Sequence, residues 1–207
     1  EGQPHGTGSL TSDDGDRYEG EWRNGLRHGQ GTMEWADGAS YRGGWRRGEP
    51  AGEGRLETAE GGVYRGEFGN GVFAGEGEFR WPDGGYYYGE WQEGERHGVG
   101  YMEWANGDYY EGEWRAGTPS GRGLIIWRDG TEYEGEWQAG EPHGYGVYRE
   151  PDGLHYEGEF HEGLATGGIL TVPSGEQYWA TMDERGNWEW TQPLPGSDKP
   201  ADAESGA

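Results

Sequence analysis

Residues 110–127 read YEGEWRAGTPSGRGLIIW, and the same pattern returns along most of the chain. Each copy begins with Tyr, carries Gly two residues later and places an aromatic residue two positions further on. A Gly-x-Gly pair follows, as at Gly121 and Gly123. Such a fixed period is typical of repeat proteins. The Tyr column has a constant spacing of 23 residues and comprises Tyr18, Tyr41, Tyr64, Tyr87, Tyr110, Tyr133 and Tyr156.

Each repeat predicts one β-hairpin. In a strand, Tyr110, Gly112 and Trp114 share one face, while Glu111 and Glu113 share the other. Asp-Gly or Asn-Gly pairs favour type I′ turns, because both central residues of that turn need positive φ. The sequence therefore predicts an all-β fold, an elongated single-layer antiparallel meander of 23-residue β-hairpins that rises about 10 Å per repeat. The pairs are Asp14-Gly15, Asp37-Gly38, Asp83-Gly84, Asn106-Gly107, Asp129-Gly130 and Asp152-Gly153.

The composition favours a thin sheet over an aliphatic core. The 207-residue chain holds 46 Gly, 12 Trp and 14 Tyr, and its formal net charge is -24. A ring from one strand can lie across a glycine of the neighbouring strand, and an aromatic cross-strand pair stabilises a sheet by about 0.2–1 kcal/mol. We therefore expect stacked Tyr and Trp rings to take the place of a conventional core.

Charge and composition exclude several classes of protein. The acidic balance argues against nucleic-acid partners and against anionic membrane surfaces. The chain contains no Cys, which rules out disulfides, thiol catalysis and Cys-ligated metals. No apolar run approaches the ~20 residues that a membrane-spanning helix needs.

Three repeated features resemble functional sites. The Glu-x-Glu pairs could suit two catalytic carboxylates, but their recurrence indicates a solvated acidic face. One repeat position holds histidines that lie too far apart on a sheet to bind one metal ion, and the Gly-x-Gly pairs lack the helix or Lys of a phosphate loop. We therefore expect no enzyme activity, no cofactor and no metal. The residues are Glu19/Glu21, Glu111/Glu113, Glu134/Glu136, Glu157/Glu159, His5, His28, His97 and His143.

The pattern resembles the MORN repeat (membrane occupation and recognition nexus), most closely in residues 18–31 and 110–127. The resemblance implies a single-layer β-sheet with an aromatic-lined groove that holds protein segments. Proteins with these repeats include radial spoke head components of cilia, cytoskeletal scaffolds, junctophilins, lipid kinases and lysine methyltransferases. In the last two groups a separate domain carries the catalysis.

The resemblance covers residues 1 to about 190, so we expect a MORN-repeat domain over 1–190 and a disordered tail over 191–207. The last repeat is atypical, because Tyr178 follows after 22 residues and lacks its Gly. Terminal repeats often differ in this way since they cap an edge. Trp188 and Trp190 are expected to fold over that edge.

We expect the aromatic columns to form the partner-binding surface, because a single sheet has no second layer to cover them. An exposed aromatic stripe is typical of binding surfaces, and the acids beside it favour a partner rich in Arg or Lys. An unpaired edge strand could also pair with a second copy to give a homodimer. The candidate residues are Trp35, Trp81, Trp104, Trp127, Tyr87, Tyr110 and Trp114.

The resemblance implies a non-enzymatic structural scaffold that docks other subunits of a large assembly. Its best match is the radial spoke head of a ciliary or flagellar axoneme, which would place the protein in the cytoplasm, on the cytoskeleton. Two alternatives stay open: a tether that binds membranes through phosphoinositides, and the regulatory arm of an enzyme complex. The charge of the chain argues against the membrane alternative.

Overall fold

The computed structural model describes residues 2–195. The chain forms two compact units. Unit 1 comprises Glu1–Asn106 and Trp114–Gly117, and unit 2 comprises Gly107–Glu113 and Thr118–Ala207. Every regular element within residues 2–195 is a β-strand, and no helix there could cross a membrane.

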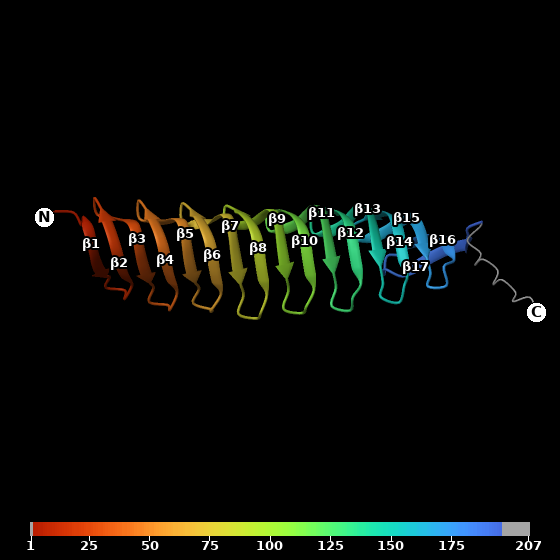
Figure 1. Cartoon of the computed structure of the whole chain (residues 1–207), viewed down its shortest axis with the longest axis horizontal. Coiled ribbons are helices and arrows are strands. Elements are labelled where there is room, and N and C mark those ends of the chain that lie inside the picture. The colour runs from red at the N-terminus through yellow and green to blue at the C-terminus, as the bar shows by residue number, and fades with distance from the viewer. Residues whose placement is uncertain (1, 196–207) are drawn as a thin grey trace, which may run out of the picture. The chain divides into compact units, whose positions relative to one another are not determined.

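Unit 1 is an antiparallel meander in which each strand pairs with the next one in the chain (Figure 1). The strand at its beginning, β1, pairs with β2 along its whole length. The strands are β1 (Gly6–Thr11), β2 (Arg17–Arg23), β3 (Leu26–Glu34), β4 (Ser40–Arg46), β5 (Glu49–Glu57), β6 (Val63–Gly69), β7 (Val72–Arg80), β8 (Tyr86–Gln92) and β9 (Glu95–Glu103).

Unit 2 repeats the same arrangement and ends at β17, which pairs with β16. Strand β10 (Tyr109–Arg115) has residues in both units. The predicted all-β meander of 23-residue hairpins is therefore confirmed. The other strands are β11 (Thr118–Ile126), β12 (Glu132–Gln138), β13 (Glu141–Arg149), β14 (His155–His161), β15 (Leu164–Thr171), β16 (Gln177–Met182) and β17 (Trp188–Pro193).

Glycines face one another across neighbouring strands, as Gly20 and Gly31 do. The Tyr18 ring covers them, because a Cβ on Gly31 would lie 2.6 Å from the ring carbons of Tyr18. We call the side that carries the Tyr and Trp columns the inner face, and the opposite side the outer face. Tyr41, Tyr64, Tyr87, Tyr110, Tyr133 and Tyr156 are fully buried on the inner face. The expected core of rings laid over glycines is confirmed.

The type I′ turns do not lie at the Asp-Gly pairs, and this prediction was wrong. At Asp37-Gly38 only the glycine has positive φ, and Trp35 N–H bonds to the carbonyl of Ala39 across a three-residue loop. Such a loop is a type I turn followed by a left-handed glycine. Two successive positive φ angles occur at the other end of each hairpin, as at Asn24-Gly25. The same site holds Arg47, Asn70, Glu93, Ala116, Ala139 and Glu162, each followed by Gly.

A β-bulge breaks the simple alternation of the second strand of the repeat, as in β3. Gly20 lies opposite Gly31, but Glu21 lies opposite His28, so Gly29 and Gln30 are additional residues on β3. Gly29 has a φ of 60°, a conformation in which glycine is preferred. The bulge bends the strand and turns Glu21 toward the unpaired backbone.

The repeat array extends beyond the expected boundary at residue 190. Strand β17 continues to Pro193, so the expectation of disorder from residue 191 was wrong for its first residues. The backbone of β17 finds hydrogen-bond partners in β16, which orders it. Residues 196–207, also assigned to the tail, lie outside the described residues.

Candidate functional site

The inner face is built from a ladder of edge-to-face rings. Tyr87 meets Trp91 at a centroid distance of 5.0 Å and Trp114, one repeat later, at 5.5 Å. In unit 2, Tyr133 meets Trp137 at 5.4 Å and Phe160 at 4.8 Å. Edge-to-face pairs add about 0.5–1.5 kcal/mol beyond the burial of their area. Each Tyr therefore joins its own repeat to the next.

The polar atoms of the ladder are bonded to the backbone. The Tyr87 hydroxyl donates to the carbonyl of Glu90 at 3.0 Å, next to the bulge. Trp114 Nε1–H donates to the carbonyl of Gly100 at 3.1 Å. Burial raises the pKa of Tyr87 and Tyr110 well above the usual value for tyrosine. These hydroxyl groups thus serve packing.

Three of the candidate binding residues belong to the core. Tyr87 and Tyr110 are 0% exposed and Trp114 is 3% exposed. A partner resting on the inner face would touch little of these three side chains. Their burial follows from the ladder, in which each Tyr is enclosed by rings and by glycine backbone.

The other four candidates keep part of their surface. Trp35, Trp81, Trp104 and Trp127 are half-buried, each in the loop that follows a strand. The first three belong to unit 1 and Trp127 to unit 2. Trp81 packs against Phe79 at 4.6 Å, and Trp127 against Tyr148 at 6.3 Å. These residues occupy equivalent positions in their repeats, and we call them the tryptophan quartet.

Trp127 lies among carboxylates. It lines a shallow pocket with Asp108, Arg128 and Asp129. The backbone N–H of Thr131 donates to Asp129 at 2.9 Å, and this bond lowers the pKa of Asp129. Asp108 accepts the backbone N–H of Arg128 at 2.9 Å. An indole beside fixed acids is suited to a cationic side chain.

Two inner-face arginines were missed by the sequence analysis. Arg27 lies 4.6 Å from the ring of Trp45 and donates to the carbonyl of Gly48 at 2.8 Å. Arg96 lies 4.5 Å from the ring of Trp114 and donates to the carbonyl of Gly117 at 2.7 Å. Burial lowers the pKa of both guanidinium groups.

A sequence signal for these arginines exists, because Arg27 and Arg96 each stand five residues after a Trp of the repeat. Pro50 and Phe73 occupy the equivalent place opposite Trp45 and Phe68. A side chain at this position therefore packs against an aromatic ring of the inner face. Some repeats place an apolar residue there and others a cationic one.

The Glu-x-Glu pairs turn out to have unequal roles. The second glutamate closes the bulge: Glu21 accepts the backbone N–H of Gln30 at 2.8 Å, and Glu113 accepts that of Arg122 at 2.9 Å. Both glutamates of each pair stay exposed, as a solvated acidic face requires, and the second one also accepts a backbone hydrogen bond. The repeated histidines lie opposite the same glutamates, as His28 does to Glu21. Within residues 2–195, no group of three His, Asp or Glu is arranged to hold a metal ion.

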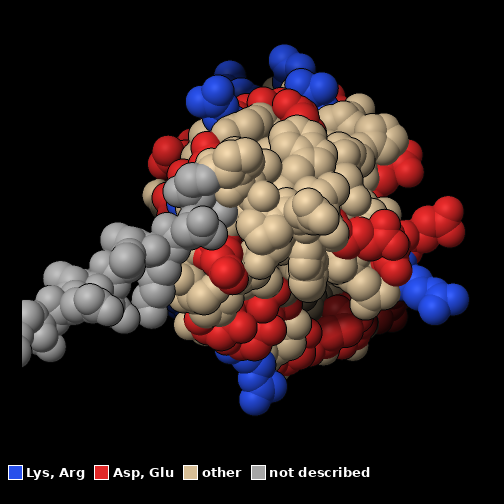
Figure 2. Space-filling model, turned by 90° about the vertical axis from the view of Figure 1, so that its right-hand side faces the viewer, with Lys and Arg blue, Asp and Glu red and all other residues tan. Residues whose placement is uncertain are grey.

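The last strands of unit 2 add rings to the inner face. Trp188 packs on Tyr156 at 4.9 Å and on Tyr148 at 5.9 Å, so it covers the end of the Tyr column. Trp190 packs on Tyr178 at 6.2 Å and stays 54% exposed. Figure 2 looks from the side of β16 and β17 and shows neutral residues in the middle of the view, with acidic residues and several basic residues around them.

The comparisons with known proteins agree with the periodicity. The family described as MORN repeat matches residues 1–17, 18–40, 41–63, 64–86, 87–109, 110–132, 133–155 and 156–167. No curated protein sequence matches the chain.

Solved structures give weaker likenesses. The TCP domain of SAS-4 (dCPAP) from Drosophila melanogaster, in complex with a proline-rich motif of Ana2 (dSTIL), is 11% identical, with a TM-score of 0.46 and coverage of 84% of this chain and 88% of that one. The TCP10 domain of CPAP from Danio rerio, in complex with a peptide of STIL, is 13% identical, with a TM-score of 0.28 and coverage of 94% and 97%. These values are too low to bear on function.

Proposed function

Because the chain belongs to the MORN-repeat family, we propose that it is a non-enzymatic scaffold that docks protein partners along its inner face. The observation that carries this proposal is the tryptophan quartet. Large aromatic side chains that stay half-exposed at equivalent repeat positions are the residues that dominate protein–protein interfaces. The buried ladder beneath them supplies a rigid support.

The partner segment that best fits the quartet is rich in Arg or Lys. Arg27 and Arg96 already lie over Trp45 and Trp114, so indole faces in this sheet accept guanidinium groups. Among residues 2–195, no arginine lies over a ring of the tryptophan quartet. A basic partner would contact the exposed parts of these rings through cation–π interactions, and the net charge of -24 would steer it toward the protein.

For the assembly itself, we propose the radial spoke head of a ciliary or flagellar axoneme. The support is the resemblance of a strongly acidic chain of MORN repeats to those components. Purification from native cilia tests this assignment: the protein should co-purify with axonemal spokes. Co-purification with a lipid kinase or a methyltransferase would instead favour the role of a regulatory arm.

The docking surface is tested by removing the quartet. The triple variant Trp35→Ala, Trp81→Ala and Trp104→Ala should lose capture of the axonemal partner. The control is Tyr88→Ala, which removes a 50% exposed aromatic ring from the outer face of unit 1, and it should capture the partner as before. Far-UV circular dichroism verifies that both variants keep their β structure. Unchanged capture by the triple variant would refute the quartet as the docking surface.

A vesicle assay tests the membrane alternative. Acidic surfaces repel anionic lipids, so the protein should stay in the supernatant when phosphoinositide vesicles are sedimented at physiological salt. Tight sedimentation with these vesicles would replace the scaffold proposal with that of a membrane tether.

A further inference from the structure

One row of side chains crosses the outer face of unit 2. The strand register places Leu124 opposite Glu134, Glu134 opposite Val147, and Val147 opposite Glu157. Glu157 then lies opposite Ile169, and Ile169 opposite Trp179. We call this the outer row: Leu124, Glu134, Val147, Glu157, Ile169 and Trp179. It alternates apolar and acidic side chains until it ends on Ile169 and Trp179.

The apolar members of the outer row keep accessible surface, since Leu124 and Val147 are half-buried and the last two are exposed. Trp179 is 50% exposed and Ile169 is 39% exposed. Tyr145, next to Val147 on the same side, is 49% exposed. An indole, a branched aliphatic chain and a phenol that lie together on a surface are typical of a binding site.

The same face is hollowed next to these side chains. A depression of about 590 Å³ is lined by Arg122, Leu124, Glu134, Tyr145 and Val147, with glycines of three strands among its other lining residues. The Cβ positions of these glycines face the inner side, where Tyr110 and Tyr133 cover them, so only backbone atoms of the glycines line the hollow. Part of the outer row therefore lines a hollow in which a partner segment can lie.

Acidic side chains prevail on the outer face of unit 2. The outer-face carboxylates of unit 2 outnumber its arginines, which are Arg122 and Arg149. Arg149 lies 3.6 Å from Glu134, and both side chains are exposed, so this contact contributes little. The carboxylates are Glu111, Glu113, Glu132, Glu134, Glu136, Glu157 and Glu159.

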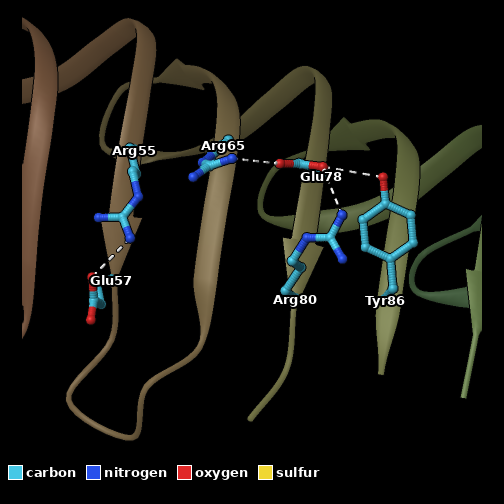
Figure 3. A network of polar contacts seen from close by, with 6 residues as sticks. All are labelled: Arg55, Glu57, Arg65, Glu78, Arg80 and Tyr86. Carbon is cyan, nitrogen blue, oxygen red and sulfur yellow. Dashed lines mark hydrogen bonds and ion pairs between the residues drawn. The ribbon is translucent and has the colours of Figure 1, made fainter. Parts of the chain in front are cut away.

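The equivalent row of unit 1 carries arginines. There the register aligns Arg42, Arg55 and Arg65 on three adjacent strands, and acids of the same face pair with Arg55 and Arg65. Arg55 pairs with Glu57 at 2.9 Å, and Glu78 pairs with Arg65 at 3.5 Å and with Arg80 at 3.7 Å (Figure 3). At the repeat positions of Arg42, Arg55 and Arg65, unit 2 instead carries Glu134, Val147 and Glu157.

We propose that the outer row docks a basic, extended partner segment with a three-residue period. Neighbouring strands lie ~4.8 Å apart, so apolar sites on alternate strands recur about every 9.6 Å, and acidic sites recur with the same spacing between them. A polyproline II segment has three residues per turn and rises about 3.1 Å per residue, so every third side chain returns to the same side after about 9.3 Å and meets the same kind of site. The segment thus carries one apolar and one Arg or Lys side chain in each triplet.

This inference rests on the proposed scaffold function but uses a surface separate from the tryptophan quartet. The quartet lies at the strand ends of the inner face, while the outer row crosses the opposite face of unit 2. The two surfaces can therefore be tested independently, one with the axonemal partner and the other with a synthetic peptide.

The probe is a fluorescently labelled peptide of about twelve residues that repeats Val-Lys-Thr, long enough to cross the row when extended. Its control has the same composition with Val and Lys in a two-residue alternation. Fluorescence anisotropy should show that the three-residue peptide binds and that binding weakens as salt is raised. The control peptide should bind about tenfold more weakly.

The decisive variant is Glu134→Arg with Glu157→Arg, which should weaken binding about tenfold or more. The fold tolerates Arg at this repeat position, because Arg42 and Arg65 occupy it in unit 1. Glu19→Arg, at the same position in unit 1, is the matched control and should bind normally. Trp179→Ala should weaken binding several-fold.

The proposal is overturned if neither peptide binds, if both bind equally, or if Glu19→Arg has the same effect as the double variant. The last two results would mean attraction by net charge alone. If the peptide does not bind, while the triple variant still loses capture of the axonemal partner, only the outer row is refuted as a docking surface. If the peptide binds, while the triple variant still captures the axonemal partner, the inner face is refuted as a docking surface instead.

Discussion

Trp91 Nε1–H donates to the carbonyl oxygen of Gly77 at 3.1 Å, and both atoms are buried. The residues are 14 positions apart in the sequence, on β8 and β7. The indole thus ties its own strand to the preceding hairpin by a hydrogen bond as well as by packing. Trp45, Trp114 and Trp137 make the same bond to Gly31, Gly100 and Gly123.

Replacing Trp91 with Phe should lower the free energy of unfolding by about 0.5–1.5 kcal/mol, because the carbonyl of Gly77 loses its indole donor while a ring remains. Phe68 and Phe160 show that the position accepts this ring. Urea unfolding followed by circular dichroism measures the change. Stability equal to that of the parent protein would mean that the indole bond contributes nothing.

Replacing Trp114 with Ala should destabilise the protein by about 3–5 kcal/mol, as truncation of a buried aromatic does. Trp114 is 3% exposed and touches Tyr87 within the ladder. Trp179→Ala is the control, because this indole is 50% exposed, and surface substitutions usually change stability by less than about 0.5 kcal/mol. Similar losses in the two variants would show that the ladder is not the core.

Replacing Ala139 with Asn should stabilise the protein by about 0.5–1 kcal/mol. Ala139 has a φ of 53°, a left-handed conformation that is strained for alanine and easier for asparagine. Asn24 occupies the same turn position with the same φ, so Asn24→Ala should have the opposite effect. Thermal unfolding of both variants measures the two shifts. Shifts of the same sign would show that the turn conformation is not what decides them.

The protein should lose stability at high pH. Burial raises the pKa of Tyr41 from 10.0 to about 12 and raises that of the other buried tyrosines as well. The unfolded chain therefore releases these protons first, so stability is fully present below pH 10 and falls as the pH rises toward 12. Tyrosinate absorbance should appear together with the loss of β structure. Titration of all tyrosines near pH 10 in the folded protein would contradict the burial.

Much of the fold could be predicted from the sequence, because the repeat makes local and cross-strand preferences agree. The spacing from Tyr110 to Tyr133 fixes one hairpin per repeat, and each glycine pair leaves room for a ring. Boundaries and turns were harder to predict. Asp37-Gly38 has the composition of a type I′ turn, yet its loop contains one more residue than that turn allows.

The candidate site could be predicted only in part. The sequence marks Tyr87, Tyr110, Trp114 and Trp127 alike as aromatic, but it does not say which rings the next repeat encloses. Burial separates them, since the first three are enclosed and Trp127 stays half-exposed. That separation depends on contacts between neighbouring repeats, such as that of Tyr87 with Trp114.

The sequence by itself determined the period, the hairpins and the aromatic core, because these follow from which residues recur at which spacing. Only the tertiary structure decided the bulge, the covering of Trp45 by Arg27 and the outer row from Leu124 to Trp179. The physical reason is register: a strand offers every second residue to a face, but backbone pairing selects which residue of another strand lies beside it.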